Sequence, residues 1–269
     1  MRKTVGISQK IKRAWLDSVL DGLVQTKDEK ELRSLVDRQL REELPGPESR
    51  AKATGIVLRI WWGVRPEHVD LRDRAVELLQ RTSFQERIWL HWGMAALAYP
   101  FFRDLTEVIG RLLALQDDFT TAQVQARILT TWGDRATSKE AVQKLITSLV
   151  DWEVLRKAKG RFLLAQKNKT PATDMQLWLL EVVLWARAAD EIEAQQLLRL
   201  PETFPFTLTA SVGDLRNHEQ FNIHRQGLDM DMVALRKLKL ERVVRPSAKR
   251  TQAKKPEPAN SVQPSFFDQ

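Results

Sequence analysis

Residues 120–164 read TTAQVQARILTTWGDRATSKEAVQKLITSLVDWEVLRKAKGRFLL, and this stretch decides the predicted fold. A helix-forming segment over 121–131 leads through Trp132-Gly133-Asp134 into a second helix over 137–152. A short hairpin follows over 154–164, with Lys-Ala-Lys-Gly between its strands. Helix, turn, helix and basic hairpin is the order of a winged helix, which can place one helix in the major groove of DNA and the hairpin over the phosphate backbone.

The second of these helices has two chemically different faces. Its apolar face should pack into the core of the domain, and it carries Val142, Leu145, Ile146, Leu149 and Trp152. The opposite face carries short polar or cationic side chains that can reach base edges or phosphates. These candidate DNA-binding residues are Ser138, Lys139, Gln143, Lys144 and Thr147.

The start of this helix and the hairpin add positive potential. Thr137 and Glu140 have the spacing of a capping box, and the dipole of the helix N-terminus favours a nearby phosphate. Each phosphate that the hairpin neutralises releases counterions, which favours sequence-independent binding. The alternative is a winged helix that contacts protein and carries ordinary surface charges, but the placement of charge favours DNA. With Gly160 at the turn, the hairpin contributes four candidate DNA-binding residues: Arg156, Lys157, Lys159 and Arg161.

The net charge of +8 is unevenly distributed along the 269 residues. Residues 236–257 contain nine Lys or Arg and two Glu, and residues 135–169 contain nine Lys or Arg and three acids. These segments carry +7 and +6, which leaves −5 for the rest of the chain. A balanced body with two basic segments predicts a localised contact with a polyanion. The alternative is a solubilising tail together with one solvated basic face.

The residue pattern gives no support to several classes of function. The chain has no cysteine, which excludes disulfides, thiolate nucleophiles and Cys-based metal centres. No P-loop, Gly-rich dinucleotide turn or nucleophile elbow occurs, and the four histidines lie outside familiar metal-ligand spacings. We therefore predict a non-enzymatic protein without cofactor or metal. The N-terminus lacks the apolar core of a signal peptide, and no apolar run approaches the ~20 residues of a membrane span, which predicts a soluble cytoplasmic protein without membrane contact.

The whole chain is predicted to be mainly α, because apolar residues recur at helical spacing and Gly and Pro are sparse. Most of the nine Trp are expected in the core, and Trp132 is the one candidate for stacking on bases. Thr26 and Glu29 predict a capping box for the second N-terminal helix.

Prolines and composition divide the chain into five predicted segments. They are an N-terminal helical hairpin or arm (1–46), a helical bundle (53–118), the winged helix (119–170), a C-terminal helix with a strand and hairpin region (171–240) and a disordered basic tail (241–269).

Residues 201–235 have the pattern of a second, reduced winged helix. A strand is predicted over 204–209, a short helix over 211–219, and a hairpin over 221–233 that contains Arg225-Gln226-Gly227. A β-rich cap on the helical bundle explains the same pattern, so the sequence leaves both interpretations open.

The stretch Gln263-Pro264-Ser265-Phe266-Phe267 resembles the motif that binds the bacterial sliding clamp, a Gln followed by two residues and then two apolar ones. Gln263 is expected to hydrogen-bond in a small pocket, while Phe266 and Phe267 fill an apolar one. Pro264 and Phe266 depart from the residues that the motif prefers. The tail is therefore a candidate docking segment for a protein partner.

Several segments between residues 56 and 164 resemble the BrxA family of the bacteriophage-exclusion (BREX) defence systems. They are Arg59-Ile60-Trp61, the helix 87–99, Tyr99-Pro100-Phe101-Phe102-Arg103-Asp104, Phe119-Thr120-Thr121, and Ser138-Lys139-Glu140-Ala141-Val142 with Leu149 and Val154-Leu155. The resemblance implies an all-helical body, DNA binding and a role in phage defence. It covers under half of the chain, whose N-terminus departs from the usual opening of the family and whose tail is extra.

Together these features predict a component of a bacterial defence system that binds double-stranded DNA through the winged helix and works with other defence-system proteins. Two alternatives stay open. One is an adaptor whose winged helix and Phe-containing tail bind proteins in a DNA-associated complex. The other is a winged-helix transcription regulator, for which a dimer and a palindromic site are expected.

Overall fold

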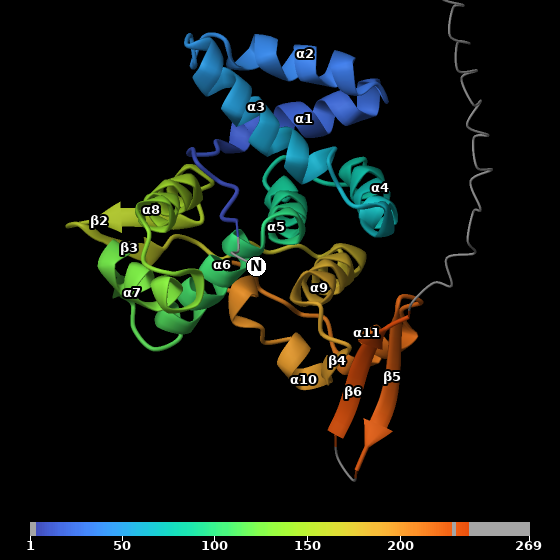
Figure 1. The fold of residues 1–269 in the computed structure, drawn as a ribbon. Coiled ribbons are helices and arrows are strands. Elements are labelled where there is room, and N and C mark those ends of the chain that lie inside the picture. Colours follow the sequence, from blue (N-terminus) through green and yellow to red (C-terminus); the bar gives the residue numbers. More distant parts are fainter. Residues whose placement is uncertain (1–3, 228–229, 237–269) are drawn as a thin grey trace, which may run out of the picture. The chain divides into compact units, whose positions relative to one another are not determined.

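Helices make up most of the fold, which confirms the prediction of a mainly α protein (Figure 1). The structure is a computed structural model that describes residues 4–227 and 230–236. Within these residues, eleven α-helices share one continuous core, and two small three-stranded antiparallel sheets lie at separate ends of the molecule. None of the helices in the described ranges is long and apolar enough to cross a bilayer.

Three N-terminal helices form the upper layer in Figure 1, and the first two belong to the body rather than to a separate arm. They are α1 (Arg13–Gln25), α2 (Glu29–Leu40) and α3 (Pro47–Trp61). Helices α1 and α2 pack against each other and against α3. Their apolar stripes join the common core through fully buried side chains, among them Leu16, Val19, Leu20, Leu32, Val36 and Val57.

The start of α2 differs from the prediction, and the capping box of Thr26 with Glu29 is wrong. Asp28 is the N-cap residue, and its carboxylate accepts a hydrogen bond from the Glu31 N–H at 2.9 Å. Thr26 lies two residues before this cap and donates to the Glu31 carboxylate instead. An Asp at the N-cap also places negative charge at the positive end of the helix dipole, which favours it over Thr26.

The central helix of the body is α5 (Arg87–Ala98), which is buried continuously from Ile88 to Ala96. It packs against α3 and against three further helices, which are α4 (Val69–Leu79, preceded by the 3-10 turn η1, Pro66–His68), α6 (Pro100–Leu113) and α9 (Thr173–Arg187). Trp92 on α5 lies edge-on to Phe102 and Trp152, with ring centroids 5.1 and 6.4 Å away. These aromatic residues pack in the core, as expected of most Trp in this chain.

His91 is fully buried in α5 and has a defined protonation state. The Trp61 indole N–H, which can only donate, donates to Nδ1 of His91 at 3.2 Å. Nε2 of His91 therefore carries the proton and donates it to Asp17 Oδ1 at 3.1 Å. Burial lowers the pKa of His91, because it disfavours the charged imidazolium.

The free energy of unfolding should consequently fall as the pH drops from about 6.5 to about 5. The unfolded chain binds a proton at His91 below its ordinary pKa of 6.5, whereas the folded protein does not, so acid favours the unfolded state. Burial is also the first cause of the lowered pKa of His68 and of His218. These two histidines therefore also reduce the free energy of unfolding as the pH falls.

The variant His91→Gln isolates the contribution of His91 to this loss, because it removes the group that titrates. Urea unfolding of the wild type and of His91→Gln at pH 7.5, 6 and 5 measures the effect, and the variant should lose less free energy over this range. An equal loss in both proteins would exclude His91 as a source.

The element order predicted for residues 120–164 is present, and we call residues 118–164 the first winged helix. After α6 come β1 (Asp118–Phe119), α7 (Thr121–Trp132), α8 (Ala136–Asp151), β2 (Leu155–Ala158) and β3 (Arg161–Leu164). Strand β3 lies between β1 and β2, and both pairings are antiparallel. A capping box of Thr120 and Gln123 starts α7. This order and pairing are those of a winged helix.

A similar succession, with a 3-10 turn added between its two helices, occurs over residues 191–235, which we call the second winged helix. After α9 come β4 (Glu191–Glu193), α10 (Ala194–Leu197), the 3-10 turn η2 (Pro201–Thr203), α11 (Val212–Asn217), β5 (Phe221–Gln226) and β6 (Met230–Leu235). Strand β6 lies between β4 and β5, again with antiparallel pairing. The predicted short helix and hairpin of this region are thus present.

The predicted strand over 204–209 is wrong. Its backbone makes one isolated bridge, between Phe206 and Asn168. The Phe206 ring instead packs in the core against Trp89, with ring centroids 4.2 Å apart, which holds this segment away from the hairpin. The first strand of the second sheet is β4, which precedes the predicted one by more than ten residues.

The pairing registers align the two sheets position by position. The first strand meets the last at a pair that packs on the core in both cases, Phe119 with the half-buried Phe162 and Ile192 with Val233. The two sheets are therefore the same scaffold with different side chains on the exposed face. Counted from these pairs, the equivalent positions on the outer face are Arg156 and Asn222, Arg161 and Met232, and Asp118 and Glu191.

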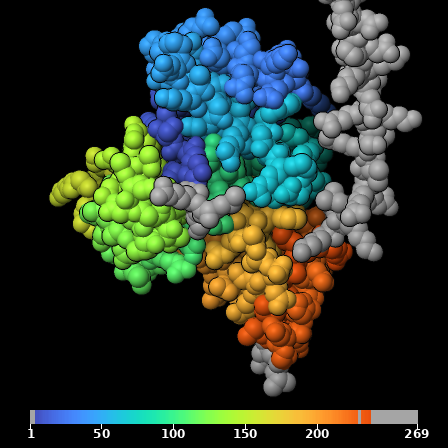
Figure 2. Space-filling view, in the orientation of Figure 1, coloured from blue at the N-terminus to red at the C-terminus, as the bar shows by residue number. Residues whose placement is uncertain are grey.

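Residues 4–12, which we call the N-terminal strap, fix α8 to the body. The Ile11 N–H donates to the Ser148 hydroxyl at 2.8 Å, and the Trp152 indole donates to the Ile11 carbonyl at 3.0 Å. The Arg13 N–H donates to Asp151 Oδ1 at 2.9 Å just beyond the strap. Figure 2 shows the strap in dark blue between the green first winged helix and the N-terminal helices. The first winged helix is therefore held to the body along α8 as well as through the core.

Candidate nucleic-acid interface

Helix α8 begins at Ala136 and has no side-chain cap. Its N-cap residue is Arg135, so Thr137 lies inside the first turn and the predicted capping box with Glu140 is wrong. The carboxylate of Glu140 lies on the exposed side of the helix, 3.9 Å from Lys144 Nζ. Within the described residues, no side chain therefore caps the N–H groups of this first turn.

Ser138 is the predicted contact residue of α8 that the structure buries. It is 0% exposed and lies on the same face as Val142 and Leu145, because residues four and seven positions apart share one side of a helix. Its hydroxyl has no hydrogen-bond partner among the described residues. The assignment of Ser138 to the DNA-facing side is therefore wrong.

The other predicted contact residues of α8 lie on its exposed side. Lys139 Nζ is 2.7 Å from Asp134 in the turn between α7 and α8. The Thr147 hydroxyl donates to the Gln143 carbonyl at 2.9 Å, and Lys144 forms the long contact with Glu140. Both lysines therefore have a carboxylate nearby, and the exposed side of α8 carries mixed charge.

The cations of the β2–β3 hairpin do not share one face. Side chains alternate along a strand, so Arg156 and Arg161 lie on the outer face of the sheet. Lys157 lies on the opposite face, with its Nζ 6.0 Å from the centroid of the Phe162 ring. Lys159 and Gly160 form the two-residue turn, and their φ angles of 49° and 78° are those that a type I′ turn requires. The hairpin thus presents cations on both faces and at its tip.

The hairpin cations also differ in whether they form an ion pair or a hydrogen bond within the protein. Arg161 pairs with Asp118 on β1, with Nε 2.6 Å from Oδ1. Arg156 and Lys159 are exposed, and neither makes a hydrogen bond or ion pair within the part of the chain that the structure describes. Arg156 and Lys159 are therefore the hairpin cations best placed to bind a phosphate.

The two winged helices have opposite net charge. Residues 118–164, the first winged helix, contain eight Lys or Arg and five Asp or Glu, a net charge of +3. Residues 191–235, the second winged helix, contain three Lys or Arg and seven Asp or Glu, a net charge of −4. The sign of the net charge therefore favours a polyanion at the first winged helix and disfavours one at the second.

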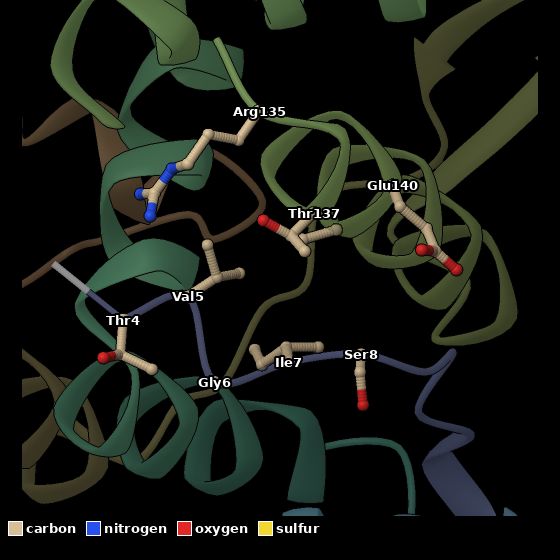
Figure 3. A pocket seen from close by; sticks show the side chains of 9 residues that line it. Thr4, Val5, Gly6, Ile7, Ser8, Arg135, Thr137 and Glu140 are labelled. Atoms are coloured by element: carbon tan, nitrogen blue, oxygen red, sulfur yellow. The ribbon is translucent and has the colours of Figure 1, made fainter. Parts of the chain in front are cut away.

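A half-open pocket of about 400 Å³ lies where the strap meets the start of α8 (Figure 3). Its lining combines Thr4 to Ser8 of the strap with Arg135, Thr137 and Glu140. Arg135 Nη2 donates to the Trp132 carbonyl at 2.7 Å. Arg135 and Glu140 lie at opposite ends of the pocket in Figure 3, so its lining carries both signs of charge and does not form a purely cationic anion site.

Trp132 is not placed for base stacking. It is 4% exposed, and its indole N–H donates to Asp104 Oδ2 at 2.9 Å.

Among the described residues, no group of three or more His, Asp or Glu could hold a metal ion. The predicted docking residues lie outside the described ranges: Gln263, Phe266 and Phe267.

The acids that pair with the candidate cations were missing from the sequence prediction. Glu140 and Lys144 have i, i+4 spacing on one helix, so local sequence contains a signal for this pair. The pair of Asp118 with Arg161 depends on the register of β1 with β3, which no local pattern reveals. The charge of the interface is therefore less positive than its lysines and arginines alone indicate.

The segments that resemble the BrxA family contribute mainly to the core, since Ile60, Trp61, Phe101 and Phe102 are all fully buried. The family assignment stays a prediction. The chain matches no protein-family model, no curated protein and no solved structure.

Proposed function

We propose that this protein binds duplex DNA through the first winged helix. In this arrangement the exposed side of α8 faces the major groove, and the β2–β3 hairpin lies along the phosphate backbone. The proposal rests on Arg156 and Lys159, two hairpin cations without a hydrogen bond or ion pair among the described residues, in a unit of net charge +3. Such cations bind phosphates without first breaking an internal ion pair.

The second winged helix supports this assignment by contrast. Its sheet has the same strand order and pairing, but Asn222 and Met232 stand at the positions of Arg156 and Arg161. A fold alone does not determine function, so the comparison of the two winged helices depends on the side chains that each one exposes. They favour the first winged helix as the DNA contact.

We further propose that binding is non-enzymatic and serves a bacterial phage-defence system of the BREX type, alongside other proteins of that system. This step rests on the resemblance of segments within residues 56–164 to the BrxA family.

Exchanging both Arg156 and Lys159 for Glu should weaken binding to a short duplex by roughly tenfold or more at about 0.1 M salt, because two phosphate contacts become repulsive. The plot of log affinity against log salt concentration should become shallower by about 2. Fluorescence anisotropy between about 50 and 200 mM salt measures both quantities.

The matched control exchanges Lys27 and Lys30 for Glu. Both lysines are exposed at the start of α2, and the control changes the net charge by the same amount. It should reduce affinity only slightly. Equal affinities and equal salt slopes in the wild type and the Arg156/Lys159 variant would exclude the hairpin as the DNA surface.

A protein-binding adaptor is the second candidate function, and the second winged helix favours it. The outer face of its sheet exposes Met230 at 46%, on the same side as Met232, Glu191 and Glu193. An exposed Met beside acidic side chains, in a unit of net charge −4, fits a protein contact better than a nucleic-acid contact. The adaptor alone predicts weak DNA binding that the Arg156/Lys159 variant leaves unchanged.

A further inference from the structure

The outermost row of side chains on α8 is not basic. Glu140, Gln143 and Thr147 follow one another at spacings of three and four residues, so they form one row along the exposed side of the helix. Lys139 and Lys144 lie on opposite sides of this row, because each residue turns the helix by about 100°. The exposed side of α8 therefore has an acidic and neutral centre with cationic edges.

Glu140 is the residue that a purely electrostatic DNA contact does not explain. Its side chain is 61% exposed, and phosphates repel its carboxylate. The contact with Lys144 is 3.9 Å long and joins two exposed groups, so it contributes little and leaves the carboxylate accessible. In the major groove, by contrast, a carboxylate can accept a hydrogen bond from the N4 amino group of cytosine.

The other two residues of the row also have chemistry that suits bases. The Gln143 amide makes no hydrogen bond within the described residues, and a Gln side chain can bond N6 and N7 of adenine together. The Thr147 hydroxyl already donates to the Gln143 carbonyl, which leaves its methyl group to contact the methyl group of thymine. Base-edge chemistry thus lies at the centre of α8, and phosphate chemistry lies at its edges.

We propose that α8 recognises base sequence in the major groove and that Glu140 selects for cytosine. This inference rests on the proposed DNA-binding function. It goes further, because counterion release by the hairpin and the flanking lysines gives no sequence preference by itself. Lys139 and Lys144 hold phosphates on either side of the groove while Glu140 approaches a base edge.

Selection from a random duplex library tests the inference. The wild-type protein should enrich duplexes with cytosine at one fixed position, and exchange of that cytosine should lower affinity on the order of tenfold. Glu140→Gln keeps the length of the side chain and removes its charge. This variant should lose the cytosine preference, and its affinity for random duplexes should rise, because phosphates no longer repel a charge at this position.

Glu153→Gln is the matched control, because Glu153 is an exposed acid in the same winged helix but outside the α8 row. It should keep the cytosine preference. Wild-type binding without an enriched cytosine, or the same preference in Glu140→Gln, overturns the inference and leaves the proposed DNA binding intact. Absence of any duplex binding by the wild type overturns the proposed function and this inference together.

Discussion

Replacing Gly110 with Ala should lower the free energy of unfolding by about 3 kcal/mol. Gly110 lies where α6 meets η2, and a Cβ at this position would sit 1.9 Å from the carbonyl oxygen of Pro201 and 2.6 Å from its carbonyl carbon. Backbone atoms cannot rotate aside as a flexible side chain does, so α6 and η2 must separate. Urea unfolding followed by circular dichroism measures the loss, which corresponds to a fall in melting temperature of roughly 6–12 °C.

Gly55→Ala provides the matched control for this prediction. Gly55 is exposed within α3, and a Cβ there meets nothing within 4 Å. Because Ala has the higher helix propensity, this change should raise the free energy of unfolding by about 0.5–1 kcal/mol. If Gly110→Ala stabilised the protein to the same degree, the close approach of α6 to η2 would be refuted.

Replacing Arg74 with Met should lower the free energy of unfolding by about 3–5 kcal/mol. Arg74 on α4 donates two hydrogen bonds to Glu181 on α9, at 2.8 and 2.7 Å, and Glu181 is only 2% exposed. The variant leaves this carboxylate buried without its cation. Burial raises the pKa of Glu181 above its ordinary value of 4.5, so protonation at low pH relieves the cost. The loss should therefore be larger at pH 8 than at pH 5.

Two variants show whether the buried carboxylate causes this loss. Arg33→Met breaks the pair of Arg33 with Glu29, whose side chains are 50% and 51% exposed, and should change the free energy of unfolding by no more than about 0.5 kcal/mol. Arg74→Met combined with Glu181→Leu should recover most of the loss, because no charge stays buried. Urea unfolding at both pH values provides the comparison. A loss in Arg74→Met no larger than that in Arg33→Met would contradict the argument.

The helices were predictable from the sequence because apolar residues recur at the period of the helix itself. On α8, Val142, Leu145 and Leu149 predicted the buried face, and all three are buried. The same periodicity places Ser138 on that face, one turn before Val142. The hydroxyl of Ser138 suggested a contact with DNA. The position of Ser138 along α8, however, places its side chain on the buried face.

The small strands could not be predicted, although they complete both winged helices. Strands β1 and β4 are two and three residues long, too short for alternation of apolar and polar side chains to show. Pairing with β3 and β6 holds them in place, and this pairing depends on the whole fold. The hairpin cations were predictable from the Lys and Arg around Gly160, but the engagement of Arg161 by Asp118 was not.

The N-terminal strap determines when the first winged helix can be completed during synthesis. Ile11 is bonded to Ser148 and Trp152, which are added to the chain 137 and 141 residues later. On the ribosome the strap is therefore synthesised long before α8. It lacks these hydrogen-bond partners while the helices between them are synthesised. Contacts between residues so far apart in sequence slow folding. We therefore expect the first winged helix to dock on the body late in folding, when the N-terminal strap packs against α8.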